Sequence, residues 1–280
     1  MPSKNETIAL LNRYGARPIK RLGQNFLVDD NIGKKIIDSL SLEEDDVVVE
    51  IGPGLGSLTF GIAERAAKVF AVEKDRLLYK ILCEISASKP PGLKIIQGDI
   101  LDQDLSKLAG AARVKVVGNL PYYVTTPILE YLIENKSMIE SAAITIQKEV
   151  ASRILAKPGS KEFGALSCFI QYHAKAQYLY TIKPTVFYPQ PEVDSSLVRL
   201  DFPERPSVNV GDEELFFRII RKAFNQRRKT IANSLTSKAL GTIAPKERLI
   251  EALSSAGISP SARPEDLGLD DFARIAESLH

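Results

Sequence analysis

A glycine-rich stretch, Gly52-Pro53-Gly54-Leu55-Gly56-Ser57, follows directly after the apolar run Val47–Ile51. Glycine lets the backbone turn tightly and lets a ligand approach the main chain with no Cβ in the way. A dinucleotide site would have its third glycine where Ser57 stands, so a pyrophosphate-gripping loop is disfavoured. An adenosyl ligand without phosphates fits better, and we predict that Gly52 and Gly54 contact it.

Two carboxylates follow the next two apolar runs. Glu73 stands 21 residues after Gly52, which is about where such folds place the acid that accepts both hydrogens of a ribose diol. In the stretch Gly98-Asp99-Ile100, Asp99 offers an acceptor to an adenine amino group and Ile100 offers an apolar wall to the ring. Either acid alone is also a good helix cap. Suitable groups after three successive apolar runs indicate an adenosyl site.

An amide, a proline and two aromatic residues follow a fourth apolar run, which ends in Asn119-Leu120-Pro121-Tyr122. The exocyclic amine of a base is a poor nucleophile because its lone pair is delocalised into the ring. The Asn119 side-chain oxygen and the Leu120 carbonyl would take its two N–H bonds and turn the lone pair toward a methyl donor. Pro121 has no N–H and fixes the chain direction. Tyr122 supplies a flat face on which an extruded base stacks.

These residues need a scaffold that brings four strand ends together. Short, nearly continuous apolar strands alternate with helical patterns, as in a doubly wound α/β fold whose parallel strands are buried on both faces. In such a sheet a ligand lies beyond the carboxyl ends of the strands. The expected strands cover 47–51, 68–73, 93–99, 113–119, 141–147, 176–182 and 196–202, and the expected helices between and around them cover 5–14, 29–40, 57–66, 75–86, 126–134, 148–156 and 165–174.

The segment 203–210 carries two prolines and no periodicity, so we place a domain boundary there. Residues 1–205 are predicted to form a Rossmann-like methyltransferase domain. Residues 206–280 show four helical patterns and no strand, and are predicted to form a small all-α domain.

Basic residues gather in two blocks without acids, although the net charge is only +2 at pH 7. Such blocks are usually solvated faces, but two of them beside one catalytic domain favour contact with nucleic acid. The residues predicted to contact RNA are Arg17, Lys20, Arg21, Arg221, Lys222, Arg227, Arg228 and Lys229.

Composition excludes several other classes. With 44% hydrophobic and 26% charged residues the chain resembles an ordinary globular protein. We see no signal peptide or membrane span, and we expect a cytoplasmic protein. Two cysteines and two histidines without ligand-like spacing indicate neither a metal site nor a disulfide. A nicotinamide dehydrogenase is disfavoured because no tyrosine has a lysine four residues on.

Taken together, the motifs resemble those of the small-subunit ribosomal RNA adenine dimethyltransferases, the KsgA or RsmA type of class I S-adenosylmethionine-dependent methyltransferase. The resemblance runs essentially from end to end. The motifs that carry it are Arg21–Leu27, the glycine loop EIGPGLGSLT, VEKD at 72–75, GDI at 98–100, NLPYYV at 119–124 and Phe187–Ser196. A local difference is Tyr188 inside the F-x-P run, a position that varies.

The resemblance implies both the reaction and its site. It implies dimethylation at N6 of two adjacent adenosines in the terminal hairpin loop of 16S rRNA, on an assembling small ribosomal subunit. Methyl transfer from a sulfonium needs no metal, and we expect a monomer. It implies that Phe187 stacks on the second face of the target base. It implies contacts with S-adenosylmethionine from Asn25, Leu27, Gly52, Glu73, Asp99 and Asn119.

Two alternatives stay open. One is the 23S-directed adenine methyltransferase that confers macrolide resistance, which shares the fold and an NLPY-like motif. The runs FYPQPEVDSS (187–196) and FNQRRKTIANSL (224–235) favour the small-subunit type. The other is a non-catalytic ribosome assembly or transcription factor. A binding module would have no reason to keep the glycine loop together with Glu73, Asp99 and Asn119.

Overall fold

The chain divides into two compact units in the computed structural model, which describes all residues except 1, 20–22, 87–89, 227, 238–240 and 242. One unit comprises Met1–Ala151 with Ala176–Phe202, and the other comprises Ser152–Lys175 with Pro203–His280. The division therefore differs from the expected ranges 1–205 and 206–280 at one segment. Residues 152–175 belong to the second unit because their apolar side chains, among them Phe163 and Cys168, share its hydrophobic core.

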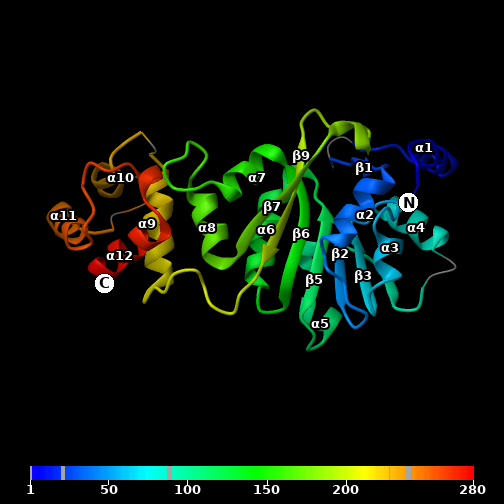
Figure 1. The fold of residues 1–280 in the computed structure, drawn as a ribbon, viewed down its shortest axis with the longest axis horizontal. Helices are drawn as coiled ribbons and strands as arrows, with labels where there is room; N and C mark the ends of the chain where they lie inside the picture. Colours follow the sequence, from blue (N-terminus) through cyan, green and yellow to red (C-terminus); the bar gives the residue numbers. More distant parts are fainter. Residues whose placement is uncertain (1, 20–22, 87–89, 227, 238–240, 242) are drawn as a thin grey trace. The chain divides into compact units, whose positions relative to one another are not determined.

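A seven-stranded sheet in the order β4-β3-β2-β5-β6-β9-β7 forms the centre of the first unit (Figure 1). The strands from β2 to β6 pair in parallel, and β9 pairs antiparallel to β6. The prediction of a doubly wound α/β fold is confirmed. The strands are β2 (Val47–Ile51), β3 (Lys68–Glu73), β4 (Leu93–Gln97), β5 (Val114–Asn119), β6 (Ile139–Gln147), β7 (Lys175–Ile182) and β9 (Ser195–Asp201).

The order of the strands decides where a ligand can enter. From β2 the chain adds β3 and β4 on one side of the sheet and then crosses to add β5 and β6 on the other. The carboxyl ends of β2 and β5 diverge into loops that leave in opposite directions, and ligands of open α/β sheets bind at that point. Ile51 pairs in register with Val72 on one side and Gly118 on the other, so the strand ends are level.

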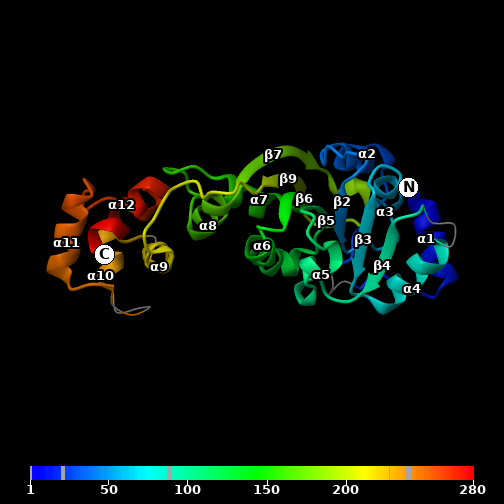
Figure 2. The ribbon, with the colours of Figure 1, turned by 90° about the horizontal axis from the view of Figure 1, so that it is seen from below.

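Helices cover both faces of this sheet. Figure 2 shows α2 and α3 on one side of the sheet and α5 and α6 on the other. Apolar residues of α2 and α3 pack on Val48, Val69 and Val117, which point to one face. The helices of the first unit are α1 (Lys4–Arg13), α2 (Asp30–Asp38), α3 (Thr59–Ala63), α4 (Arg76–Ile85), α5 (Leu105–Ala109) and α6 (Thr125–Glu134), with 3-10 turns η2 (Ile100–Asp102), η3 (Tyr122–Val124) and η4 (Pro184–Val186).

A second, two-stranded sheet was not predicted. It pairs β1 (Phe26–Leu27) antiparallel with β8 (Phe187–Tyr188), with Phe26 opposite Tyr188 and Leu27 opposite Phe187. The Val28 N–H extends the pairing by donating to the Val186 carbonyl at 2.9 Å. The N-terminal motif and the late FYPQP motif therefore lie side by side, although some 160 residues separate them.

The second unit is helical, as expected for residues 206–280. Its core is built from apolar faces of several helices, with Phe216 and Phe272 fully buried. The helix α7 (Lys148–Leu155) enters this unit from the sheet, and the others are α8 (Ala165–His173), α9 (Glu213–Phe224), α10 (Ile231–Thr236), α11 (Lys246–Ser255), α12 (Leu269–Leu279) and the turn η5 (Pro264–Asp266). Within the residues that the structure describes, no helix combines the length and apolar character required of a membrane span.

Candidate active site

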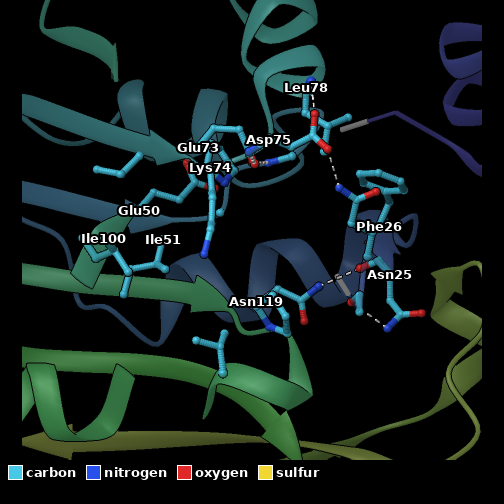
Figure 3. A pocket seen from close by; sticks show the side chains of 18 of the residues that line it. Asn25, Phe26, Glu50, Ile51, Glu73, Lys74, Asp75, Leu78, Ile100 and Asn119 are labelled. Atoms are coloured by element: carbon cyan, nitrogen blue, oxygen red, sulfur yellow. Dashed lines mark hydrogen bonds between the residues drawn. The ribbon is translucent and has the colours of Figure 1, made fainter. Parts of the chain in front are cut away.

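A pocket opens at the carboxyl edge of the parallel strands, and the chain segments that follow β2, β3, β4 and β5 line it together with the N-terminal segment (Figure 3). All residues predicted to bind the adenosyl ligand line this pocket, as do two residues of the predicted catalytic motif. These are Asn25, Leu27, Gly52, Gly54, Glu73, Asp99 and Ile100 for the ligand, Asn119 for both roles, and Pro121 for the motif.

Glu73 connects the end of β3 to the glycine loop. Its side chain is 6% exposed, one carboxylate oxygen accepts from the Gly54 N–H at 2.9 Å, and the other accepts from the Asp75 N–H at 2.8 Å. Burial raises the pKa of Glu73, and the two backbone donors oppose that rise. Each oxygen keeps a second lone pair, so the carboxylate can accept further hydrogen bonds from a diol in the pocket.

The glycine loop has the backbone that its residues require. Gly52 has φ +67° and Gly54 has φ +57°, a conformation that other residues rarely adopt. A Cβ added to Gly52 would meet no protein atom within 4 Å, whereas one added to Gly54 would lie 3.2 Å from the Phe26 ring. The first glycine therefore leaves open space beside the pocket, and the second admits the aromatic ring of the N-terminal segment.

Glu50 is a pocket residue whose role was not predicted, although it precedes the glycine loop directly. It is 2% exposed, lines the pocket, and its Oε2 atom has no hydrogen-bond partner among the described residues. Burial raises the pKa of Glu50 to about 8, the Thr59 hydroxyl opposes this rise, and the Glu73 carboxylate adds to it. A buried oxygen without a partner is costly, so a ligand that brings a donor or a positive charge to this oxygen would be stabilised there.

Asp99 stands at the end of β4 and already has two partners. Its Oδ1 atom caps the turn η2 by accepting from the Leu101 N–H at 3.2 Å, and Oδ2 pairs with Lys74 Nζ at 2.6 Å. Asp99 therefore does cap a helical turn, which is the alternative role that the sequence allowed. Lys74 follows Glu73 and lines the same pocket with Ile100, so an acceptor, a cation and an apolar wall meet there.

The orientation of Asn119 is determined by the N-terminal segment. Asn119 Nδ2 donates to the Asn25 carbonyl at 2.8 Å (Figure 3). Because a carbonyl can only accept, the amide nitrogen must face Asn25, and the amide oxygen remains an acceptor on the other side. Asn119 therefore presents the group that the sequence interpretation requires of it.

The N-terminal segment is itself tied to the strand ends. Gln24 Nε2 donates to Asp75 Oδ2 at 3.1 Å, and Ser57 Oγ donates to the Leu27 carbonyl at 2.8 Å. These contacts, with that of Asn119, attach residues 24–27 to the glycine loop, to the N-terminal end of α4 and to β5. A short motif far from the sheet in sequence thus becomes one wall of the pocket.

The remaining residues of the predicted catalytic set do not line the pocket. Tyr122 is half-buried and its hydroxyl lies 2.8 Å from Ser195 Oγ, while the Leu120 side chain is buried. Phe187 is 2% exposed and packs in the core with Leu27, so its ring has no free face for a base in this conformation. The roles of these three residues stay predictions, and stacking on Phe187 requires a local rearrangement.

Tyr123, the second tyrosine of the motif, was not singled out. It is 53% exposed and lines the pocket mouth, and its proximity to Lys74 contributes to a raised pKa of that lysine, for which Asp99 is the main cause. The second of the two tyrosines in NLPYY is the sequence feature from which this pocket residue could have been predicted. Within the described residues, no group of three His, Cys, Asp or Glu side chains is arranged to hold a metal ion.

The basic blocks are only partly the surfaces that were predicted. Lys222 is wrong as an RNA contact: it is 2% exposed and its Nζ donates to the Gly241 carbonyl. Burial lowers the pKa of Lys222, and Arg218 adds to the effect. The side chains of Arg17, Arg221, Arg228 and Lys229 are exposed, whereas Lys20, Arg21 and Arg227 lie outside the described residues.

Comparison with known proteins connects this site to a family. The model of the family described as "Ribosomal RNA adenine dimethylase" matches residues 17–280. Two curated relatives, both named "Ribosomal RNA small subunit methyltransferase A", come from Moorella thermoacetica and Shouchella clausii. The first is 45% identical over 98% of this chain and 96% of its own length, and the second is 46% identical over 98% and 94%.

Solved structures agree at the level of the fold. A dimethyladenosine transferase from Plasmodium falciparum superposes with a TM-score of 0.77 at 22% identity, covering 89% of this chain and 95% of its own. The 23S rRNA methyltransferase ErmE superposes with a TM-score of 0.71 at 27% identity, covering 91% and 99%. The match of the family model over nearly the whole chain, together with the two full-length relatives, shows that this chain belongs to the ribosomal RNA adenine dimethylase family.

Proposed function

We propose that this enzyme transfers methyl groups from S-adenosylmethionine to N6 of two adjacent adenosines in the 3′-terminal hairpin loop of 16S rRNA, during assembly of the small ribosomal subunit. The observation that carries the proposal is the oriented amide of Asn119 in the pocket. Its Nδ2 donates to Asn25, which leaves its oxygen as an acceptor at the end of β5. An amine placed there would find the acceptor that a delocalised lone pair needs.

The pocket residues suit an adenosyl ligand. Glu73 would accept from the ribose hydroxyls, Asp99 from the adenine amine, and Ile100 would pack on the ring. The unpartnered Oε2 of Glu50 would face a positively charged part of the ligand. When bound, S-adenosylmethionine supplies a methyl group on a positively charged sulfur that leaves as a neutral thioether.

The protein's contribution to the reaction is alignment and electrostatics. Asn119 and the Leu120 carbonyl would accept the two N–H bonds of the target amine and stabilise the positive charge that develops on its nitrogen. Pro121 contributes no competing N–H. Tyr122, held through its hydroxyl by Ser195, would present its ring to the extruded base. Phe187 would cover the other face of the base after the local rearrangement that its buried ring requires.

The small-subunit substrate is favoured over the 23S alternative by relatedness. The two curated relatives named for the small subunit are 45% and 46% identical to this chain over nearly their full lengths, whereas ErmE is 27% identical. The non-catalytic alternative would leave unexplained why the pocket keeps Glu50, Glu73 and Asn119 together. We further propose that the enzyme is a cytoplasmic monomer.

One experiment tests the proposal directly. The protein is incubated with labelled S-adenosylmethionine and unmethylated small subunits, and the modified nucleotides are mapped. We expect label on two adjacent adenosines of the 16S hairpin loop, with two methyl groups each. Label confined to 23S rRNA in a parallel reaction would support the resistance-type enzyme, and no transfer to either RNA would support a binding factor. The matched control is Asn119→Ala, which should bind subunits without methylating them.

A further inference from the structure

Two lysines share one aspartate beside the predicted base site. Lys183 Nζ lies 2.9 Å from Asp194 Oδ2, and Lys148 Nζ lies 3.8 Å from the same oxygen. The side chains of Lys183 and Lys148 are 67% and 57% exposed, while that of Asp194 is 24% exposed. Two ammonium groups therefore share one carboxylate oxygen of Asp194.

The cluster adjoins Tyr122 through the strands that carry it. Asp194 precedes Ser195, whose Oγ atom lies 2.8 Å from the Tyr122 hydroxyl. Ser195 pairs in register with Gln147, the last residue of β6, and the Lys148 N–H donates to the Asp194 carbonyl at 3.0 Å. β6 and β9 run side by side in Figure 1. The cluster therefore lies at the same edge of the sheet as the NLPY motif.

Nothing in the adenosyl pocket uses these lysines, because neither lines it. Exposed ion pairs contribute little to stability, so exchanging the carboxylate for another anion costs the fold little. Lysine ammonium groups bind phosphate as point charges on flexible side chains. Two lysines at one position can therefore bind the phosphate of an RNA strand without requiring one exact backbone geometry. An RNA strand that presents a base to Tyr122 must carry a phosphate within a few ångströms of that base.

We propose that Lys148 and Lys183 bind a backbone phosphate of the RNA strand next to the target adenosine, and that Asp194 is the counter-ion which the phosphate displaces. This inference rests on the proposed function, because it assumes that the target base stacks on Tyr122. Asp194 holds the two amines at the site in the free protein and competes with RNA for them. The ligand is a nucleic-acid phosphodiester of a single strand.

The alternative is that Asp194 merely fastens the loop before β9 to α7 and β7. The two roles predict opposite signs for Asp194→Asn, which keeps the side-chain shape and the backbone hydrogen bond to Lys148. If Asp194 is a competing counter-ion, this variant should bind unmethylated small subunits several-fold more tightly at low salt. If Asp194 is only a tether, the variant should bind subunits equally well or more weakly, and the proposal is overturned.

A second variant tests the lysines. Lys148→Gln combined with Lys183→Gln should weaken subunit binding and reduce the slope of log K against log salt by about 0.7 for each phosphate that is no longer neutralised. The matched control is Lys107→Gln on α5, an exposed lysine that also pairs with an aspartate, Asp104, and it should leave the slope unchanged. A double variant with the parent's slope would contradict the proposal.

Two readouts separate this inference from the function itself. S-adenosylmethionine affinity and the thermal unfolding midpoint should be the same in parent, double variant and Asp194→Asn, because the cluster lies outside the adenosyl pocket. If the parent methylates the hairpin adenosines while the lysine variants bind like the parent, only the phosphate site is wrong. If the parent itself transfers no methyl groups, the proposed function is wrong.

Discussion

Each edge of the parallel sheet buries an ionisable side chain, but the two side chains differ in how completely they are hydrogen-bonded. At the amino edge Lys115 is 6% exposed, and its Nζ lies 2.8 Å from the Ser41 carbonyl, 2.8 Å from Asp46 and 3.8 Å from Glu140. At the carboxyl edge Glu50 is more deeply buried, yet one of its oxygens has no partner among the described residues. Both residues lie in strands that are otherwise mostly apolar.

The difference distinguishes a structural charge from a functional one. A buried ion that is fully bonded ties strands together and leaves no capacity for a ligand. A buried polar or ionisable group with unused hydrogen-bonding capacity costs stability and is kept only where something else benefits. On this criterion Lys115 belongs to the scaffold, while Glu50, Glu73 and Asn119 belong to the site. Variants of Lys115, Asn119, Glu73 and Glu50 test that separation.

Lys115→Met should be the most damaging change to the fold. It leaves Asp46 and the Ser41 carbonyl poorly satisfied at the amino edge, and removing one partner of a buried pair typically costs about 3–5 kcal/mol. The measurement is denaturant unfolding. Lys107→Met, at an exposed pair on α5, is the control and should cost at most about 1 kcal/mol. Under conditions where Lys115→Met is still folded, its affinity for S-adenosylmethionine should equal that of the parent. A loss of affinity would show that Lys115 also affects the pocket at the carboxyl edge.

Asn119→Ala should act on turnover and leave folding nearly unaffected. It removes an acceptor used as charge develops on the amine, so single-turnover methyl transfer on pre-bound subunits should fall on the order of a hundredfold or more. Asn119→Asp is the sharper variant, since a carboxylate cannot donate to the Asn25 carbonyl and loses the orientation seen here. Transfer at the parent rate in either variant would reduce Asn119 to a strand-end cap.

Glu73→Ala should act on cofactor affinity. The change removes a charged acceptor for the ribose hydroxyls, and each such hydrogen bond is worth roughly 1.5–3 kcal/mol. The variant also frees the Gly54 and Asp75 N–H groups, so part of the loss will come from a less ordered glycine loop. Calorimetric titration with S-adenosylmethionine measures the effect. Parent-like affinity would show that this carboxylate serves only the loop.

Most of the elements and most of the residues that line the candidate pocket could be predicted because the relevant signals are local. Each apolar strand is followed within a few residues by the group that it presents, so Glu73, Asp99 and Asn119 were readable from the sequence. The helix predicted over 57–66 is shorter in the structure, where α3 covers Thr59–Ala63. The five-residue α5 was not predicted, since so short a helix has little periodicity. Nothing near Lys115 in sequence shows that Asp46 and Glu140 will surround it.

Lys222 shows a signal that was present but misread. It was assigned to a basic block by its neighbours in sequence, whereas its place in α9 follows Leu215 and Ile219 at spacings of seven and three residues, on the buried face. The pairing of β1 with β8, and with it the buried position of Phe187, depends on contacts that no local pattern reveals. Charge composition therefore misled where helical periodicity would have corrected it.

A smaller effect is expected for Glu50→Gln, on the way in which the unfolding free energy depends on pH. In the folded protein Glu50 keeps its proton up to about pH 8, while its ordinary pKa is 4.5. The folded state therefore holds an extra proton between these values, and the contribution of Glu50 to the unfolding free energy falls as pH rises through that window. Glu50→Gln removes this titration, so the unfolding free energy of the variant should depend less on pH between pH 5 and pH 8. The difference between variant and parent in unfolding free energy should therefore increase from pH 5 toward pH 8.

The same residue should link cofactor binding to proton release. A cation beside Glu50 favours the carboxylate, so binding of S-adenosylmethionine near neutral pH should expel the Glu50 proton, and affinity should rise a few-fold toward pH 8. Calorimetry in two buffers of different ionisation heat counts the protons released. Glu50→Gln should release fewer, while protons lost from the ligand's own amine appear equally in both proteins. Equal proton release from parent and variant would show that Glu50 does not respond to the ligand and that, like Lys115, it serves only the fold.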